Sequence, residues 1–229
     1  MDKILGLRAI CRLFLGAEAA VYLVDFFGGK AVMKLRLAKT YRVPELDHRI
    51  RSLRTVNEAR AMWRATQSGV KVPALLAVSR KGAAILMAYV DGVKLSNVTG
   101  DVAEQTSQLV GESIAKLHLG GAVHGDAVPT NMILSGRELF LIDFGLSESG
   151  YSIEQRAVDV NLFLRFAKLT WETSYSKIEA GFRDAYLGEM GNTDGSRVMQ
   201  RVSEIRLRGR YVPERKLHDN NAEVTYVES

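Results

Sequence analysis

The stretch from His124 to Gly145 restricts what this chain can fold into more than any other part of the sequence. It reads HGDAVPTNMILSGRELFLIDFG. Asn131 follows Asp126 by five residues, and Asp143 stands close to the end of the stretch. A carboxylate, an amide and a second carboxylate at this spacing are typical of a site that binds phosphate through a metal ion.

Two short apolar runs lie between Asn131 and Asp143, at 132–134 and 138–142, on either side of Ser135-Gly136-Arg137. This pattern predicts a hairpin, which would return Asp143 to the side of Asn131 and bring two metal ligands together. Protein kinases take these groups from an H-R-D-x-x-x-x-N loop and a D-F-G turn. A chance D-F-G after an unrelated turn is the alternative, but the order and spacing of all three pieces favour the kinase interpretation.

The N-terminal part predicts a small antiparallel sheet. Residues 4–15 and 20–27 read as strands around Gly16-Ala17-Glu18-Ala19, a turn of small residues whose backbone could approach phosphates. The turn lacks a G-x-G-x-x-G pattern, so an ordinary hairpin turn remains the alternative. Residues 74–78 and 83–89 read as two further strands, and in a kinase the backbone at Met87, Ala88 and Tyr89 would contact adenine.

A third strand, Ala31–Lys34, precedes a predicted helix over Pro44–Gln67, with the proline near its start. Strand alternation puts Val32 and Lys34 on one face. We predict that Glu58 pairs with Lys34, because a carboxylate beside an apolar stripe needs a partner to offset its desolvation. The predicted buried stripe of this helix is Val56, Ala59, Met62 and Trp63.

The rest of the chain predicts a mostly helical lobe. Helices are expected at 99–119, capped by Thr99 or Asp101, and at 156–168, 173–187 and 194–206, with Gly209 and Pro213 breaking regular structure afterwards. The fold class is therefore α+β, a minimal two-lobed protein-kinase-like fold with a small antiparallel-sheet lobe around one main helix. We expect the small lobe over 1–90, the large lobe over 91–217 and a polar tail over 218–229.

Three polar residues are expected to have structural roles, two of them at the catalytic loop. His118 is interpreted as a core histidine, and His124 is expected to pack under the loop and hold the backbone of Asp143. Asp159 is expected to accept hydrogen bonds from the loop backbone. Only 16 positions separate Asp143 from Asp159, and no A-P-E lies between them. This segment is too short to form both a phosphorylated activation loop and a platform for a peptide substrate.

Composition restricts the function classes further. The net charge of +5 and the pI near 9.3 are compatible with a polyanionic partner. The segment from Lys34 to Arg64 is unusually basic, and it could be either a solvated helix face or a surface that contacts RNA or protein. Cys11 is the one cysteine, so no intramolecular disulfide can form, and no apolar run reaches the ~20 residues that cross a bilayer. We therefore expect a cytoplasmic protein without a membrane segment.

The chain resembles the small kinase/ATPase subunit of the KEOPS complex, the family that includes PRPK, over nearly its whole length. The specific pieces are K-x-Y-R-x-P-E-L-D followed by R-T-x-x-E-A-R. The full set of matching segments is GAEA (16–19), MKLRLAKTYRVPELD (33–47), RTVNEAR (54–60), GVKVP (69–73), HGDAVPTNMI (124–133), IDFGLSE (142–148), AVDV (157–160) and RLRGR (206–210).

The resemblance implies ATP and Mg²⁺ as cofactors, and autophosphorylation or ATP hydrolysis in a complex that forms threonylcarbamoyl-adenosine in tRNA. It implies that Lys34 and Glu58 orient the phosphates, that Asp126 is the catalytic acid/base, and that Asn131 and Asp143 hold Mg²⁺. The implied partners are a threonylcarbamoyltransferase at the large lobe, a small regulatory subunit at the small lobe, and tRNA at basic residues.

Two departures from this pattern keep other functions open. The loop lacks the lysine that Ser/Thr kinases carry two residues after the catalytic aspartate, and the tail lacks a dense RGRKR-like cluster. A nucleotide-binding scaffold that holds the transferase and tRNA is the main alternative to an ATPase. A stand-alone protein or small-molecule kinase is a third reading, which the short segment after D-F-G disfavours.

Overall fold

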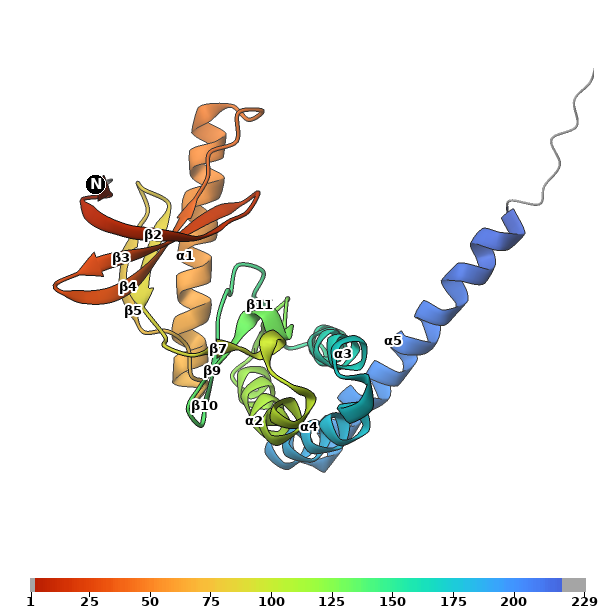
Figure 1. The fold of residues 1–229 in the computed structure, drawn as a ribbon. Coiled ribbons are helices and arrows are strands. Elements are labelled where there is room, and N and C mark those ends of the chain that lie inside the picture. The colour runs from red at the N-terminus through yellow and green to blue at the C-terminus, as the bar shows by residue number, and fades with distance from the viewer. Residues whose placement is uncertain (1–2, 220–229) are drawn as a thin grey trace, which may run out of the picture.

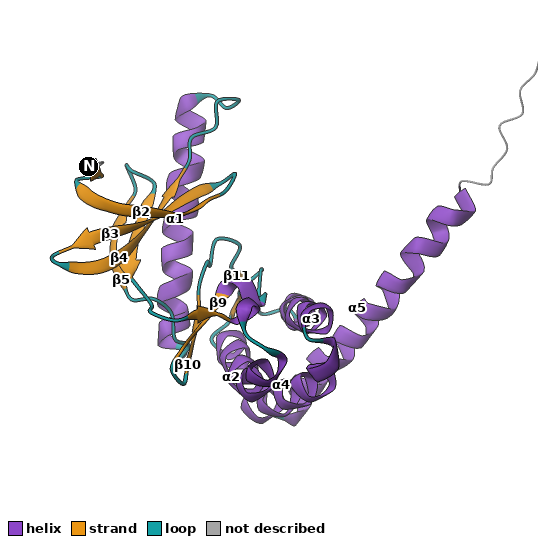
Figure 2. Ribbon diagram, in the orientation of Figure 1, coloured by secondary structure: helices purple, strands orange, loops and turns teal. Residues whose placement is uncertain are grey.

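The computed structural model describes residues 3–219, with the side chains of residues 5–208. It has two lobes: a sheet lobe crossed by one long helix, and a helical lobe from which the last helix extends (Figure 1). The predicted α+β class is present, with a six-stranded sheet in the small lobe and most of the helices in the large lobe (Figure 2).

The small lobe holds a six-stranded antiparallel sheet in the order β1-β2-β3-β4-β6-β5. Strand alternation gives this sheet two different faces. Ala31 and Met33 pack into an apolar cluster with Val24 and Leu86, whereas Lys34 faces the other way. The strands are β1 (Lys3–Ile4), β2 (Leu7–Leu15), β3 (Ala19–Phe26), β4 (Gly29–Arg36), β5 (Leu75–Ser79) and β6 (Ala84–Ala88).

Helix α1 (Pro44–Gln67) has the predicted bounds and begins with its proline in the first turn. The predicted buried stripe is only partly right. Ala59 and Met62 are buried, but Val56 is half-buried and the Trp63 side chain is 59% exposed. Alanines 61 and 65 pack inward instead, because small side chains let the helix approach its neighbours closely.

The large lobe is built on α2 and α4, which lie side by side, with α3 and α5 against them. A three-stranded sheet in the order β10-β9-β7 and the pair β11-β8 join it to the small lobe. The elements are β7 (Val93–Lys94), η1 (Leu95–Asn97), α2 (Gly100–Leu119), β8 (Ala122–Val123), η2 (Pro129–Asn131), β9 (Met132–Ser135), β10 (Glu138–Leu141), β11 (Glu148–Ser149), α3 (Ile153–Thr170), η3 (Glu172–Ser174), α4 (Tyr175–Met190) and α5 (Asn192–Asp219).

Two predictions about helix ends are wrong. Thr99 occupies the N-cap position of α2, but neither its side chain nor that of Asp101 makes a capping hydrogen bond. Helix α5 does not stop before Gly209 and Pro213 but runs to Asp219. The residues around them, Arg, Glu, Lys and Leu, are strong helix formers that oppose the cost of a single glycine and proline. Most of the predicted polar tail, 220–229, lies outside the described residues.

Within residues 3–219, no helix is long and apolar enough to span a bilayer.

The contact between α2 and α4 depends on Gly111, and this can be tested. A Cβ at Gly111 would lie 2.4 Å from the carbonyl oxygen of Phe182, whereas a Cβ at Gly188 of α4 would meet nothing within 4 Å. Gly111→Ala is therefore expected to lower the free energy of unfolding by about 1–3 kcal/mol. Gly188→Ala is expected to raise it by about 0.5–1 kcal/mol through helix propensity. Equal changes in the free energy of unfolding for the two variants, measured by chemical denaturation, would contradict this close contact of α2 and α4.

Candidate active site

The predicted hairpin is present and brings Asn131 beside Asp143. Strands β9 and β10 pair in register, and the amide of Ile142 donates to the carbonyl of Asn131 at 2.9 Å. Leu139 and Leu141 are buried beneath it. Asp143 itself adopts a left-handed φ of 61°, which aspartate tolerates better than most residues.

Asn131 also fixes Asp126. Its Nδ2 donates to the Oδ2 of Asp126 at 2.8 Å and to the Asp126 carbonyl at 3.0 Å. With its amide nitrogen engaged in this way, Asn131 keeps its Oδ1 as an acceptor for a cation. The loop therefore holds two oxygen-bearing side chains in fixed relative positions next to Asp143.

The predicted pair between Lys34 and Glu58 is present, and a second cation shares it. The Glu58 carboxylate, whose side chain is 1% exposed, accepts from Lys34 Nζ at 2.6 Å and from an Arg36 guanidinium nitrogen at 2.5 Å. Sequence reasoning missed Arg36. The signal was there, because Arg36 stands two residues after Lys34 and strand alternation puts both on one face. The buried Nε of Arg36 has no hydrogen-bond partner.

Lys34 also contacts Asp143, with 2.6 Å between Nζ and Oδ1. Partial burial raises the pKa of Asp143, but the charge and the hydrogen bond of Lys34 outweigh it and hold the pKa below its ordinary value. Asp143 is therefore a carboxylate at neutral pH. Together Lys34, Glu58 and Asp143 link β4, α1 and the end of the hairpin in one chain of ion pairs.

The turn at 16–19 closes over this site. Gly16 donates its amide to the Ala19 carbonyl at 2.9 Å, and Glu18 pairs with Arg54 of α1 at 2.8 Å. Lys39 reaches the same turn, where it bonds the Ala17 carbonyl and lies 3.7 Å from Glu18. Sequence reasoning missed Arg54 and Lys39, because nothing in their spacing points to a turn more than twenty residues earlier.

The family-specific motif explains how Lys39 is held. Asp47, buried in the first turn of α1, accepts from the Lys39 amide at 3.2 Å and from Arg51 at 2.6 Å. The hydrogen bond from Arg51 holds the pKa of Asp47 below its ordinary value against the opposing effect of burial. The K-x-Y-R-x-P-E-L-D segment is therefore a clamp that ties the turn at 16–19 to α1.

A cavity of about 590 Å³ lies under the turn. Its lining brings together most of the predicted site residues, namely Gly16, Ala17, Glu18, Ala19, Lys34, Glu58, Asp126 and Asp143, along with Arg36 and Arg54. Asn131 adjoins this cavity through Asp126 without lining it. Met87, which is buried in β6, and Tyr89, which directly follows that strand, do not line the cavity either. Contact of their backbone with adenine stays a prediction.

These residues fit a magnesium nucleotide. Mg²⁺ prefers oxygen ligands and is usually held by one or two carboxylates together with substrate phosphates and water. Asp143 and the Oδ1 of Asn131 offer such oxygens, and the described side chains include no cluster of three or more acidic, histidine or cysteine residues that could hold a metal without help. Lys34, Arg36 and Arg54 supply positive charge for phosphates.

The predicted supports of the loop are also present. Asp159 accepts from the amides of His124 at 2.5 Å and Gly125 at 2.8 Å. His118 is a satisfied core residue between Tyr186 at 2.8 Å and Asp159 at 3.3 Å. His124 lies under the loop as expected, but its ring contacts the carbonyl of Ile142 at 3.0 Å rather than Asp143 itself.

Gly125 explains why the loop reads H-G-D. Its φ is +79°, and a Cβ there would lie 2.2 Å from the Leu146 carbonyl oxygen. The chain after Asp143 therefore passes directly over this position, where no arginine side chain fits. Ser147 then donates to the Val123 carbonyl at 2.6 Å, and β11 pairs with β8. The short segment after D-F-G is folded back onto the loop.

The buried His118 predicts a pH dependence. Burial lowers the pKa of His118 from its ordinary 6.5, and the hydrogen bond and charge of Asp159 only partly compensate. The unfolded chain therefore binds this proton more readily, so the free energy of unfolding should fall as pH drops below about 6.5, by at most about 1.4 kcal/mol per pH unit. In denaturation between pH 5 and 7, His118→Gln should flatten this slope, while the exposed control His48→Gln should keep it. The same slope in His118→Gln and wild type would contradict the assignment.

Comparison with known proteins identifies the family and the fold. A family model described as the RIO domain matches residues 32–152. In its fold, the chain is similar to the crystal structure of the Rio2 kinase of Chaetomium thermophilum in its ADP/Mg²⁺-phosphoaspartate complex. The TM-score is 0.57 and the identity 16%, with 86% of this chain and 72% of that one covered.

Curated relatives are closer in sequence. The KEOPS complex subunit Bud32 of Pyrococcus abyssi is 37% identical over 86% of this chain and 94% of its own length. A probable serine/threonine-protein kinase BUD32 homolog of Archaeoglobus fulgidus is 34% identical over 88% and 96%. A probable bifunctional tRNA threonylcarbamoyladenosine biosynthesis protein of Methanosarcina barkeri is 38% identical, and this chain spans only 35% of it. The chain therefore belongs to the RIO-domain family and, within it, to the family of the KEOPS complex subunit Bud32.

Proposed function

We propose that this chain is a Mg-ATP-dependent atypical serine/threonine kinase/ATPase that serves a KEOPS complex in the threonylcarbamoyl-adenosine modification of tRNA. The observation that carries the proposal is the convergence of Lys34, Glu58, Asp126 and Asp143 on one cavity, with Asn131 bonded to Asp126. Relatives named for the KEOPS complex and for threonylcarbamoyladenosine biosynthesis support the biological setting.

Each residue has a proposed role. Lys34, held by Glu58, contacts the phosphates, and the turn Gly16-Ala17-Glu18-Ala19 covers them with its backbone. Asn131 and Asp143 hold Mg²⁺, and Asp126 orients the attacking oxygen and accepts its proton. When bound, Mg-ATP supplies the phosphoryl group and screens the negative charge that develops on it.

Nucleotide binding would rearrange the ion pairs. Lys34 pairs with both Glu58 and Asp143. If its ammonium turned from Asp143 toward a phosphate, the carboxylate of Asp143 would become available to the metal. Glu58 keeps Lys34 close during this exchange, and Arg36 keeps Glu58 in place. The half-exposed Asp143 can make this exchange at a lower cost than the buried Glu58 can.

Hydrolysis fits the site better than phosphorylation of a free peptide does. The segment after Asp143 folds back through Ser147 and β11, so it offers no platform for an extended substrate. No lysine follows Asp126 at the second position, so the transferring phosphate has one cation fewer. We therefore propose ATP turnover that depends on a partner, with a threonylcarbamoyltransferase at the large lobe and a small regulatory subunit at the small lobe, in the cytoplasm.

The scaffold alternative is favoured by one observation: Lys34 forms an ion pair with Asp143, the proposed metal ligand. The basic segment at 206–208 gives this alternative little support. Arg206 is directed inward, toward Glu179 at 3.0 Å, Tyr175 at 3.2 Å and Asn161 at 3.3 Å. Of Arg206 and Arg208, only Arg208 is exposed.

ATP hydrolysis by the purified chain, alone and with the transferase subunit, tests the proposal. Asp143→Ala is expected to reduce turnover at least about 100-fold, because it removes a metal ligand at the transferring phosphate. Asp184→Ala removes an exposed carboxylate of α4 and should leave turnover unchanged. Partner-stimulated turnover that survives Asp143→Ala would contradict the proposed site. Nucleotide binding without turnover in any condition would favour the scaffold.

A further inference from the structure

Helix α1 carries a row of positive charge on its outer side. Arg49, Arg60 and Arg64 are exposed there and make no ion pair with any described residue. From His48 to Gln67 the one acidic residue is Glu58, which is buried against Lys34 and Arg36. The exposed face of this part of the helix therefore has no negative charge of its own.

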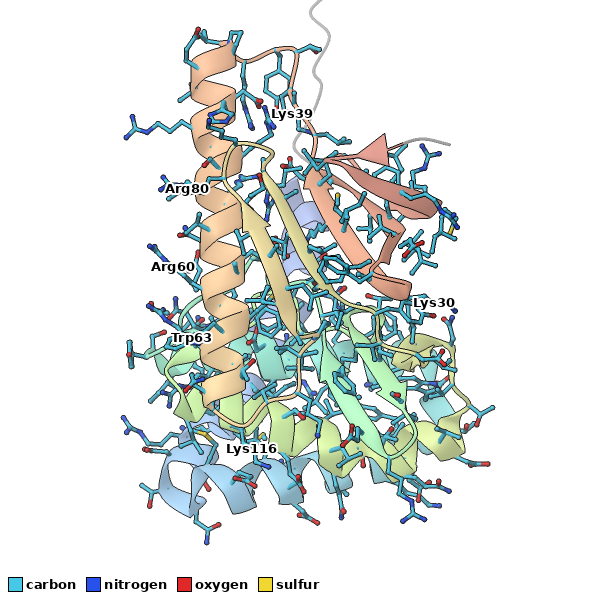
Figure 3. All side chains as sticks on the ribbon, turned by 90° about the vertical axis from the view of Figure 1, so that its left-hand side faces the viewer. Lys30, Lys39, Arg60, Trp63, Arg80 and Lys116 are labelled. Atoms are coloured by element: carbon cyan, nitrogen blue, oxygen red, sulfur yellow. The ribbon has the colours of Figure 1, made fainter. Side chains whose placement is uncertain are left out.

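The turn between β5 and β6 adds to the same surface. Arg80 and Lys81 are exposed and likewise unpaired among the described residues. A shallow groove joins the turn to the helix, lined by His48, Arg49, Ser52, Leu53, Val56, Arg60 and Arg80. Figure 3 shows Arg80, Arg60 and Trp63 following one another along this side of α1. We call Arg49, Arg60, Arg64, Arg80, Lys81 and Trp63 the outer α1 surface.

An aromatic ring stands among these cations. The Trp63 side chain is 59% exposed and makes no hydrogen bond within the described residues, although its position on the helix predicted burial. Positions 49, 53, 56, 60 and 63 follow the 3.6-residue period and so form one stripe. By helical rise, Arg49 and Arg60 are about 16 Å apart, which matches about five steps of a nucleic acid strand.

We propose that the outer α1 surface binds RNA, with the arginines on phosphates of one strand and Trp63 stacked on an unpaired base. Unpaired cations interleaved with an exposed aromatic ring are what recognition of single-stranded segments requires. The inference deepens the proposed function, since it gives the chain a contact surface for the tRNA.

The test is fluorescence anisotropy of the full chain, without nucleotide or partner, on a labelled tRNA transcript. The triple variant Arg49→Gln, Arg60→Gln, Arg80→Gln should bind at least about tenfold more weakly near 0.1 M salt. Its log–log salt slope should fall by about 2–3, at 0.7–0.9 per lost phosphate contact. The matched control is Arg137→Gln, Arg165→Gln, Arg183→Gln, which removes the same charge from exposed arginines elsewhere and should change affinity less than about threefold.

Trp63→Ala provides a second, independent readout. It should weaken binding to the tRNA about fivefold or more, leave the salt slope unchanged, and have little effect on a blunt RNA duplex without unpaired bases. The α1 triple variant is Arg49→Gln, Arg60→Gln, Arg80→Gln. Equal losses of RNA affinity in the α1 triple variant and in its matched control, or unchanged RNA affinity in the α1 triple variant, would overturn the proposal. If the α1 triple variant bound RNA normally but failed to copurify with the transferase complex, the outer α1 surface would be a protein interface. That result would also overturn the proposal.

Failure of this inference can be separated from failure of the proposed function. The α1 triple variant leaves the cavity residues untouched and should hydrolyse ATP like the wild type. Asp143→Ala should keep its RNA affinity. Loss of RNA binding only in Asp143→Ala would contradict the assignment of RNA binding to the outer α1 surface. Loss of ATP turnover in Asp143→Ala would not contradict it.

Discussion

The buried carboxylate of Glu58 is the interaction on which the rest of the site depends. It lies in the centre of α1 and holds two cations of β4, Lys34 at 2.6 Å and Arg36 at 2.5 Å. A carboxylate removed from water in this way is tolerated only because both partners are present, and removal of one side of a buried pair commonly costs about 3–5 kcal/mol. The same charge balance fixes the helix to the sheet and keeps Lys34 directed at the cavity, so stability and the proposed nucleotide chemistry share one set of atoms.

Around this centre the chain uses short polar ties in place of a long activation segment. Asp159 holds the catalytic loop from below through two backbone amides, and Gly125 lets the segment after Asp143 lie directly on that loop. Glu18 and Lys39 fasten the turn at 16–19 to α1. Each tie is local, and together they leave little of the site to be organised by phosphorylation. Control by a protein partner is the form of regulation that such a site allows.

The sequence predicted these features unevenly, for physical reasons. The loop, the hairpin and the bounds of α1 follow from spacing and periodicity, which are local properties, and the pair of Lys34 with Glu58 follows from the cost of a buried charge. Arg54 and Lys39 were missed because their partners are distant in sequence and any surface arginine or lysine has the same local pattern, whereas the position of Arg36 on the face of Lys34 could have revealed it. Trp63 was placed in the core because periodicity gives a stripe but not which of two adjacent stripes faces inward. That error is informative, since it left an aromatic ring on the basic side of α1.

The proposed role of Glu58 is to act on the nucleotide through Lys34. The most direct test of this role is the affinity for Mg-ATP, measured by calorimetry, of the wild type, Glu58→Gln, Lys34→Met and the double variant. Glu58→Gln should weaken binding about tenfold when Lys34 is present and less than about twofold when Lys34 is replaced by methionine. The same loss in both backgrounds would show that Glu58 acts independently of Lys34 and would contradict this role.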